Sequence, residues 1–342
     1  MKENVQQMGK ARGKEDLQYF VAQYSNSSDL TATENQCNVV WKSTFNFLQV
    51  PRSELSSESE GSMEAFSIHR DSLAAIQILS RNKKQLNETI TVDQFDTLLN
   101  IANIGRTNKE DINQDINDSA IVVEALKCLY NLVYESNNCR IICLKSEAIN
   151  GIVRRLRTYI STSISIYRDK NLTWDMQYFD MKLLFLITAI DPDGRTKVRD
   201  DQNGLICLTS LQNRPQELND RQVNLVIEIM KVLFNFTSVA TEKIGDIQFR
   251  GLAVVLHDLL LLRAASEEKH IELWSNTINL LTTVPTACYS ELVIPMHIHV
   301  DSLVNGINWG QKISAIRCDI EMFGNTVKHN AETIEDDRNG TI

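Results

Sequence analysis

Apolar residues recur along the chain, from Ser67 onward, at the spacing of amphipathic helices. Steps of three and four residues place such side chains on one face of a helix, which can then be buried against a neighbour. Representative sets are Leu73, Ile76 and Leu79, and then Ile121, Ala125, Leu129 and Leu132. With only 5 Pro and 13 Gly to interrupt helices, the pattern predicts an all-α protein.

The helical blocks repeat. Five of them can be aligned: AIQILSRN (75–82), LKCLYNLV (126–133), MKLLFLIT (181–188), MKVLFNFT (230–237) and TINLLTTV (277–284). We take Ser80, Asn131, Leu186, Asn235 and Asn279 as the corresponding positions. Helical periods a little above 40 residues, with variable loops, predict an armadillo or HEAT-like solenoid, a right-handed superhelix. Each unit would have two or three helices, and the aligned block would belong to the last of them.

Polar segments divide the chain into three expected regions. Residues 1–62 have a helical start but are polar and poorly periodic, and they end in the Ser-rich acidic run SELSSESEGS (53–62), expected to be an exposed loop. Residues 63–305 hold the helical repeats, with expected loops at 103–118, 190–204 and 211–222. Residues 306–342 lose the periodicity and are expected to be disordered.

Charge and apolar content exclude several classes of protein. A net charge of −9 argues against a general nucleic-acid binder, which must neutralise phosphates. No apolar signal segment follows the N-terminus, and the most apolar stretch, residues 251–265, contains His257, Asp258 and Arg263. We therefore expect a cytoplasmic protein without an integral membrane segment. The 7 Cys include no CxxC pair, which favours reduced thiols in the core over disulfides.

Sequence motifs of catalysis or cofactor binding are absent. The chain has no GxxxxGK[ST], GxGxxG, HExxH or GxSxG motif, so we expect no enzyme and no cofactor. His297 and His299 could bind a metal, but packed or surface histidines explain this short HIH pattern better. Cys139 and Cys143 share a helix face, where packing is again the stronger explanation.

Asn131, Asn235 and Asn279 raise the main question of the sequence, because each lies within an apolar helical block. An unpaired buried amide costs on the order of 1–3 kcal/mol. Two explanations are about equally supported. The amides could line a concave groove and bind the backbone of a peptide, or they could bond to neighbouring units and set the stacking register.

Neighbouring side chains favour the groove. Lys127 and Lys231 precede Asn131 and Asn235 by one turn and share a helix face with them, and Arg81 follows the first block. The aligned helices also carry the aromatic residues Tyr130, Tyr178, Phe179, Phe185 and Phe234. Such a face could accept a peptide with an apolar end and a carboxylate.

Four segments, in order, resemble one protein family. They are ILSRNKK (78–84), EALKCLYNLVYES (124–136), MQYFDMKLLFLITAI (176–190) and EIMKVLFNFT (228–237). They resemble the synembryn family, exchange factors and folding chaperones for the α subunits of heterotrimeric G proteins. The resemblance covers roughly residues 67–300, including INLLTTVPTACYSEL (278–292), and none is found after about residue 305. Family members continue with further helical units and an acidic tail.

The resemblance implies an armadillo-type superhelix whose concave face captures the C-terminal helix of Gα, so that GDP leaves without covalent chemistry. The implied partner is Gα, GDP-bound or nucleotide-free and without βγ, which could recruit the chain to the cortex of the plasma membrane. Carried over by position, the groove comprises Arg81, Lys127, Asn131, Phe179, Phe185, Lys231 and Phe234, to which Asn235 and Asn279 are added. Arg81 would lie near the acidic or carboxylate end of the ligand. The alternative is an armadillo scaffold or adaptor without exchange activity.

Overall fold

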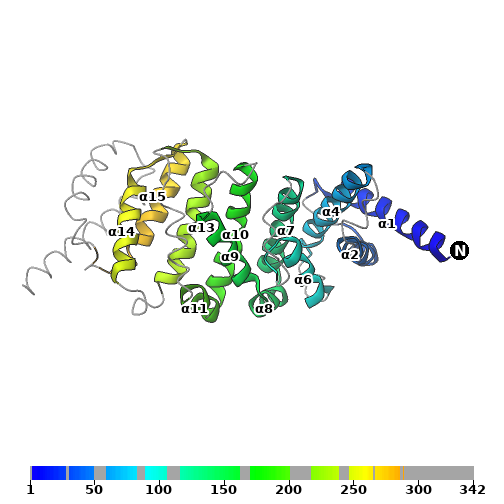
Figure 1. The fold of residues 1–342 in the computed structure, drawn as a ribbon, viewed down its shortest axis with the longest axis horizontal. Helices are drawn as coiled ribbons and strands as arrows, with labels where there is room; N and C mark the ends of the chain where they lie inside the picture. Colours follow the sequence, from blue (N-terminus) through cyan, green and yellow to red (C-terminus); the bar gives the residue numbers. More distant parts are fainter. Residues whose placement is uncertain are drawn as a thin grey trace, which may run out of the picture. The chain divides into compact units, whose positions relative to one another are not determined.

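The structure is a computed structural model. It describes residues 2–27, 31–49, 59–82, 89–105, 116–161, 170–200, 217–238, 246–264, 266–285 and 288. By its internal contacts the chain divides into two units, Met1–Lys197 and Val198–Ile342. The predicted all-α class is confirmed, since helices make up nearly all of the described chain (Figure 1). None of the described helices combines the length and the apolar character needed to span a bilayer.

Unit 1 is a succession of helices in which neighbours along the chain pack on one another. They are α1 (Lys2–Tyr24), α2 (Glu34–Leu48), α4 (Ser59–Leu79), α6 (Val92–Ile101), α7 (Ile116–Glu135), α8 (Asn137–Lys145), α9 (Ala148–Ser161), α10 (Lys170–Ile190) and α11 (Pro192–Asp200), the last ending just past the boundary. α4 packs on α7, and α7 packs on α10 (Figure 1). The aligned blocks lie towards the C-terminal ends of these three helices, as the repeat predicts.

Helix starts in unit 1 follow from local sequence. Thr33 caps α2 by accepting a hydrogen bond from the backbone N–H of Gln36, whose side chain accepts one in return from the N–H of Thr33. Thr91 and Gln94 form the same reciprocal arrangement at the start of α6. These capping boxes satisfy backbone donors that have no partner within the helix.

The first 62 residues contribute more to the core than their polar composition suggests. Apolar side chains of α1 and α2 are buried, and both helices pack on α4. The buried set is Leu17, Phe20, Tyr24, Cys37, Val40, Trp41, Phe45 and Leu48. The expectation of a poorly periodic region was therefore wrong, because these residues do recur at helical spacing between exposed polar ones. The expected loop at 53–62 is also shorter, since α4 begins at Ser59.

Arg155 connects three segments of unit 1. From α9, its guanidinium forms a two-pronged ion pair with Asp180 of α10, in which Nε donates to Oδ2 at 2.8 Å. Its Nη1 donates to the carbonyl of Ala102, at the end of α6, at 2.5 Å. The Asp180 side chain is fully buried. Burial raises the pKa of this carboxyl, and the Arg155 guanidinium opposes that rise.

Gly151 permits the close approach of α9 to the loop after α6. A Cβ at this position would lie 2.1 Å from the carbonyl oxygen of Ile104, which is backbone and cannot rotate away. The loop itself leaves α6 through Asn103, whose φ of 56° is left-handed and is tolerated by Asn better than by most residues. This geometry brings the Ala102 carbonyl within reach of Arg155.

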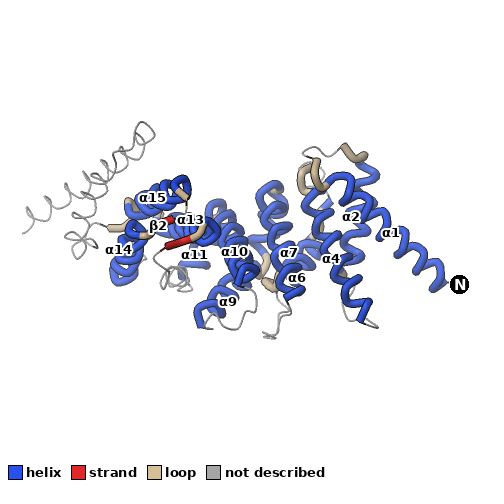
Figure 2. Tube along the Cα trace, turned by 90° about the horizontal axis from the view of Figure 1, so that it is seen from above, coloured by secondary structure: helices blue, strands red, loops and turns tan. Residues whose placement is uncertain are grey.

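Unit 2 contains α13 (Asp220–Thr237), α14 (Asp246–Leu261) and α15 (Glu267–Leu281), with α15 packed on both of the others. A parallel pair of two-residue strands, β1 (Glu217–Leu218) and β2 (Arg263–Ala264), joins the segments that precede α13 and α15 (Figure 2). The aligned blocks again form the C-terminal parts of α13 and α15. Cross-helix contacts fix their register, with Thr277 Oγ1 3.4 Å from Met230 Sδ and Thr283 Oγ1 2.6 Å from Thr237 Oγ1.

Two further expectations concern loops and tails. The predicted loop at 190–204 contains α11, whose start is stabilised by Asp191, a carboxylate that accepts from the N–H of Gly194 at 2.9 Å. The helix was missed because its sequence, PDGRTKVRD, has no apolar periodicity. The predicted tail at 306–342 lies outside the described residues.

Cysteines within the described residues confirm the expectation of reduced core thiols. Cys37, Cys128, Cys139, Cys143 and Cys288 are all free and buried. Burial raises the pKa of Cys139 to about 11 and that of Cys143 to about 12. Desolvation disfavours the thiolate, which is the reactive form.

We predict that Asp180→Ala lowers the free energy of unfolding by about 3–5 kcal/mol, because it leaves the Arg155 guanidinium buried without its counter-charge. Urea denaturation of the purified chain measures the loss. Lys127→Met is the control: its ion pair with Glu124 is about one-third exposed on both sides, so solvent screening limits its loss to about 1 kcal/mol or less. Equal losses for the two variants would contradict the structural role of Arg155.

We also predict that Cys139 and Cys143 resist alkylation by iodoacetamide at pH 8 in the folded protein and react once urea unfolds it. Because both pKa values are raised on folding, their contribution to stability is complete below the ordinary thiol pKa of about 8.5. It is lost as the pH rises through about 11 and 12. Peptide mass spectrometry identifies the modified thiols, and rapid alkylation of either in the native state would refute their burial.

Candidate partner-binding face

The side of α7 that is not buried carries a stripe of polar and aromatic residues. α7 contacts α4 and α10, so a wide arc of its surface is apolar and buried. The remaining stripe consists of Glu124, Lys127, Tyr130, Asn131 and Tyr134, spaced three and four residues apart. We call these residues the α7 stripe.

Asn131 lies on this stripe and is half-buried, so it is not enclosed in the apolar core. Within the described part of the chain, no hydrogen bond joins its side-chain amide to another residue. The structure therefore gives no support, for Asn131, to the idea that the amide sets the register between units. An amide belongs in this apolar block because its position faces outward, where both its donor and its acceptor remain available.

α10 continues the stripe next to α7. Its half-buried side contains Tyr178, Phe179, Lys182 and Phe185. The ammonium of Lys182 lies 4.2 Å from the ring centroid of Tyr130, across the helix contact, and 5.2 Å from that of Tyr178. Lys127 reaches from α7 to the ring of Phe179, at 5.7 Å. These cation–π contacts interleave the basic and aromatic side chains of the two helices.

The Glu124 carboxylate links the α7 stripe to α4. It pairs with Lys127 at 2.7 Å, and it accepts a hydrogen bond from the Gln77 amide of α4 at 2.9 Å. The predicted residues Lys127, Asn131, Phe179 and Phe185 thus belong to one face, built by α4, α7 and α10 of unit 1. We call it the unit 1 face.

α13 of unit 2 repeats the arrangement of α7. Glu228 pairs with Lys231 at 2.8 Å, three residues apart, as Glu124 pairs with Lys127. Phe234 and Asn235 follow in the places of Tyr130 and Asn131. The Phe234 side chain is 41% exposed, which is unusual for a phenylalanine in an apolar block and leaves its ring available for contact.

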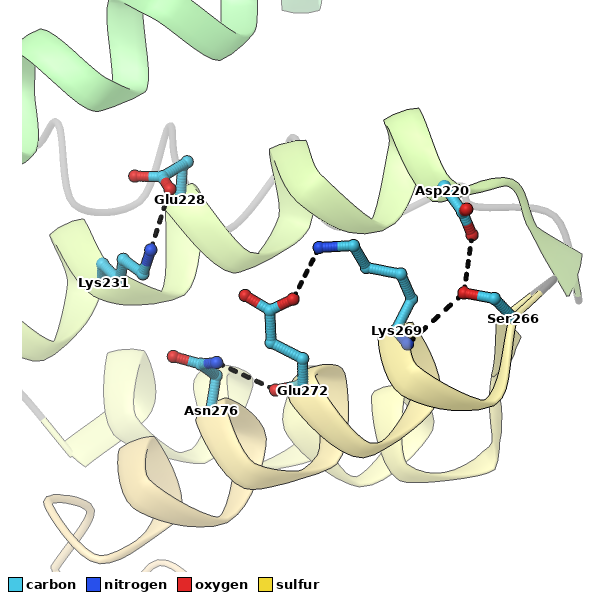
Figure 3. A network of polar contacts seen from close by, with 7 residues as sticks. All are labelled: Asp220, Glu228, Lys231, Ser266, Lys269, Glu272 and Asn276. Carbon is cyan, nitrogen blue, oxygen red and sulfur yellow. Dashed lines mark hydrogen bonds and ion pairs between the residues drawn. The ribbon is translucent and has the colours of Figure 1, made fainter.

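α15, which packs on α13, also carries polar side chains that contact one another and α13 (Figure 3). Lys269 pairs with Glu272 at 2.6 Å, and its pKa is raised mainly by that hydrogen bond. Ser266, which caps α15, donates to Asp220 at the start of α13 at 3.1 Å (Figure 3). The cross-helix bond fixes the N-terminal end of α15 against α13.

Asn279 does not occupy the place that the sequence alignment gave it. The contacts between α13 and α15 join residues 46 and 47 apart, so the level of Asn235 corresponds to residues 281 and 282 of α15. Asn279 lies two or three residues earlier, on the exposed side of the helix.

Arg81 lies just past the end of α4 and is directed towards α1. Its Nη1 donates to the carbonyl of Tyr24 at 3.1 Å and also to the carbonyl of Ser27. These bonds satisfy carbonyls at the C-terminal end of α1. In this structure, therefore, the guanidinium is used to hold α1 against the end of α4.

The chemistry that these faces offer is binding. Within the ranges that the structure describes, no group of three or more His, Cys, Asp or Glu side chains could hold a metal ion. His297 and His299 lie outside those ranges. Lysines, amides and exposed aromatic rings suit a peptide that offers apolar side chains and acceptor oxygens.

Tyr134 and Lys182 were missed as candidates. Tyr134 is 52% exposed and stacks on Tyr130 at 6.0 Å. A repeat alignment could have found Lys182, because it occupies the same place in its block as Lys127 and Lys231.

The sequence profile of the family described as "Guanine nucleotide exchange factor synembryn" matches residues 72–333. The match extends beyond residue 305, so the expectation that the resemblance ends there was wrong. The protein called Chaperone Ric-8 from Drosophila melanogaster is 30% identical over 249 residues, covering 66% of this chain and 42% of that protein. Chaperone Ric-8B of Mus musculus is 30% identical over 244 residues, covering 66% and 45%.

The chain spans less than half the length of these curated relatives. Among solved structures, a designed armadillo repeat protein is similar with a TM-score of 0.43 and 12% identity, covering 77% of this chain and 99% of that one.

The position of Arg81 leads to a prediction. Arg81→Met removes the bonds to α1 and should increase limited chymotrypsin cleavage after Tyr19, Phe20 and Tyr24 at least severalfold, because the end of α1 loses its attachment. Cleavage rates measured by mass spectrometry test this, with the exposed Arg70→Met of α4 as the control. Unchanged cleavage in both variants would show that Arg81 does not hold α1.

Proposed function

We propose that this chain, which belongs to the synembryn family, is a guanine-nucleotide exchange factor and folding chaperone for G-protein α subunits. It would bind the C-terminal helix of Gα and favour the nucleotide-free state. The family match over residues 72–333 is the observation that carries this proposal. The activity requires binding and no covalent step.

Side chains on both units support the proposal. Asn131 has no hydrogen-bond partner for its amide among the described residues, and it shares the unit 1 face with the half-buried rings of Tyr130 and Phe179. On α13, Phe234 offers an exposed ring next to Asn235. A helical peptide could place apolar side chains against such rings while its terminal carbonyls, which lack partners within the helix, accept hydrogen bonds from amides and lysines.

The mechanism we propose is thermodynamic. A partner that binds nucleotide-free Gα more tightly than the GDP complex shifts the population towards the free state. The size of the shift is limited by the ratio of the two affinities. The same preference would let the chain stabilise a Gα subunit that is still folding, because such a subunit has not yet bound nucleotide.

The proposed partner is Gα in its GDP-bound or nucleotide-free form, without βγ. We place the protein in the cytoplasm, with recruitment to the cortex of the plasma membrane through Gα. Gα classes differ in the sequence of their C-terminal helix. The experiment below compares peptides with these different sequences and so tests which class is bound.

An armadillo-type adaptor for unrelated peptides is the second candidate. Exposed aromatics beside lysines and amides would also suit other helical ligands. The two candidates differ in one respect: an adaptor need not distinguish the nucleotide states of a G protein.

We predict that the purified chain binds fluorescent peptides with the C-terminal sequences of Gα subunits and accelerates GDP release from the matching Gα. Asn131→Ala and Phe234→Ala should each weaken peptide binding about tenfold, the effect of removing a contact of about 1.4 kcal/mol. Fluorescence anisotropy measures the first effect, and release of labelled GDP measures the second.

Asn150→Ala is the matched control, because Asn150 is an exposed amide on α9, a helix that contributes no residue to the unit 1 face. Peptide binding without faster release would limit the activity to capture. Absence of peptide binding would favour the adaptor, and equal binding by all variants would refute the assignment of the faces.

A further inference from the structure

The second position of three aligned blocks is a lysine, and these lysines have different surroundings. Lys127 of α7 and Lys231 of α13 each follow a glutamate by three residues. Both form ion pairs with it, at 2.7 Å and 2.8 Å. On α10 the corresponding residue before Lys182 is Phe179, so the helix supplies no carboxylate at that place.

Lys182 is instead surrounded by rings. Its ammonium lies 4.2 Å from the centroid of Tyr130, 5.2 Å from that of Tyr178 and 6.0 Å from that of Phe179. Across the described residues, its ammonium has no ion pair and no hydrogen bond to another side chain or to a carbonyl. The face of an aromatic ring attracts a cation. Unlike a carboxylate, however, it has no oxygen that accepts a conventional hydrogen bond from the ammonium. The ammonium is held in position with its donors unused.

Each of the other two lysines forms an ion pair with a glutamate, and each of these pairs has no net charge. Lys182 therefore supplies an uncompensated positive charge to the unit 1 face, beside apolar rings. A single cation with apolar walls is complementary to the end of a peptide chain, which combines one carboxylate with a last apolar side chain. The C-terminal end of a helix carries partial negative charge as well, and it would strengthen the attraction.

We infer that Lys182, within the rings of Tyr130, Tyr178 and Phe179, is the subsite for the terminal carboxylate of the bound Gα helix. This inference rests on the proposed function and assigns to Lys182 the role that the family resemblance suggested for Arg81. Arg81 donates to carbonyls of α1, whereas Lys182 is available on the same face as Asn131 and Phe179.

The test compares one Gα C-terminal peptide as the free acid and as the C-terminal amide, with fluorescence anisotropy on the full chain. The wild-type chain should bind the free acid about tenfold more tightly than the amide, as expected for a charge-assisted hydrogen bond. Added salt should reduce this preference, because it screens the charges.

Two variants remove the preference in different ways. Lys182→Gln deletes the charge, and Phe179→Glu gives Lys182 the same glutamate partner that Lys127 and Lys231 have. Each should bind the two peptides with affinities within about twofold of one another. The ratio is measured within each variant, so a general loss of affinity cancels, and binding of the amide by Lys182→Gln shows that the variant is folded. Lys145→Gln, at an exposed lysine on α8, should keep the full preference.

Equal affinities of the wild-type chain for the two peptides would overturn the inference and leave the proposed function intact. A preference that persists in Lys182→Gln would also overturn it and would place the carboxylate on another cation. If the wild-type chain binds neither form of any Gα peptide, the proposed function fails, and this subsite fails with it.

Discussion

Burial of α7 between α4 and α10 is the interaction on which the rest of unit 1 depends. Because neighbours cover both sides of α7, its apolar residues occupy a wide arc, and only one narrow stripe remains for polar side chains. That stripe holds Lys127 and Asn131 beside the rings supplied by α10. The stacking of helices thus creates both the core and the candidate binding face, so a change in the register of α7 would alter both. The buried pair of Arg155 and Asp180 is a second constraint within unit 1, because it joins α9 to α10 and to the end of α6.

The fold class could be predicted from the sequence because apolar spacing is a property of each helix by itself. The repeat of the blocks could be predicted for the same reason, and each of the five blocks lies at the C-terminal end of a helix. The contribution of the N-terminal helices to the core was not predicted, because their buried residues, such as Trp41 and Phe45, are separated by many exposed polar ones. α11 was missed because its sequence has no apolar face to detect.

The candidate site could be predicted only in part. The sequence predicted that Lys127, Asn131 and Phe179 line one surface, and the structure does bring them onto the unit 1 face, which remains a candidate site. It could not identify the direction of a long side chain: Arg81 points towards carbonyls of α1. Spacing alone also could not show that Lys182 lies among aromatic rings of two helices, whereas Lys127 forms an ion pair. The surroundings of Lys182 depend on the contact between α7 and α10.

The proposed exchange activity requires that this chain bind nucleotide-free Gα more tightly than the GDP complex. The dissociation constant of the chain for a Gα subunit should be determined with the nucleotide removed and again with saturating GDP, by titration calorimetry. The proposed function predicts binding to nucleotide-free Gα that is tighter by at least tenfold. Equal dissociation constants in the two states would contradict it, because a partner that binds both equally cannot shift the population between them.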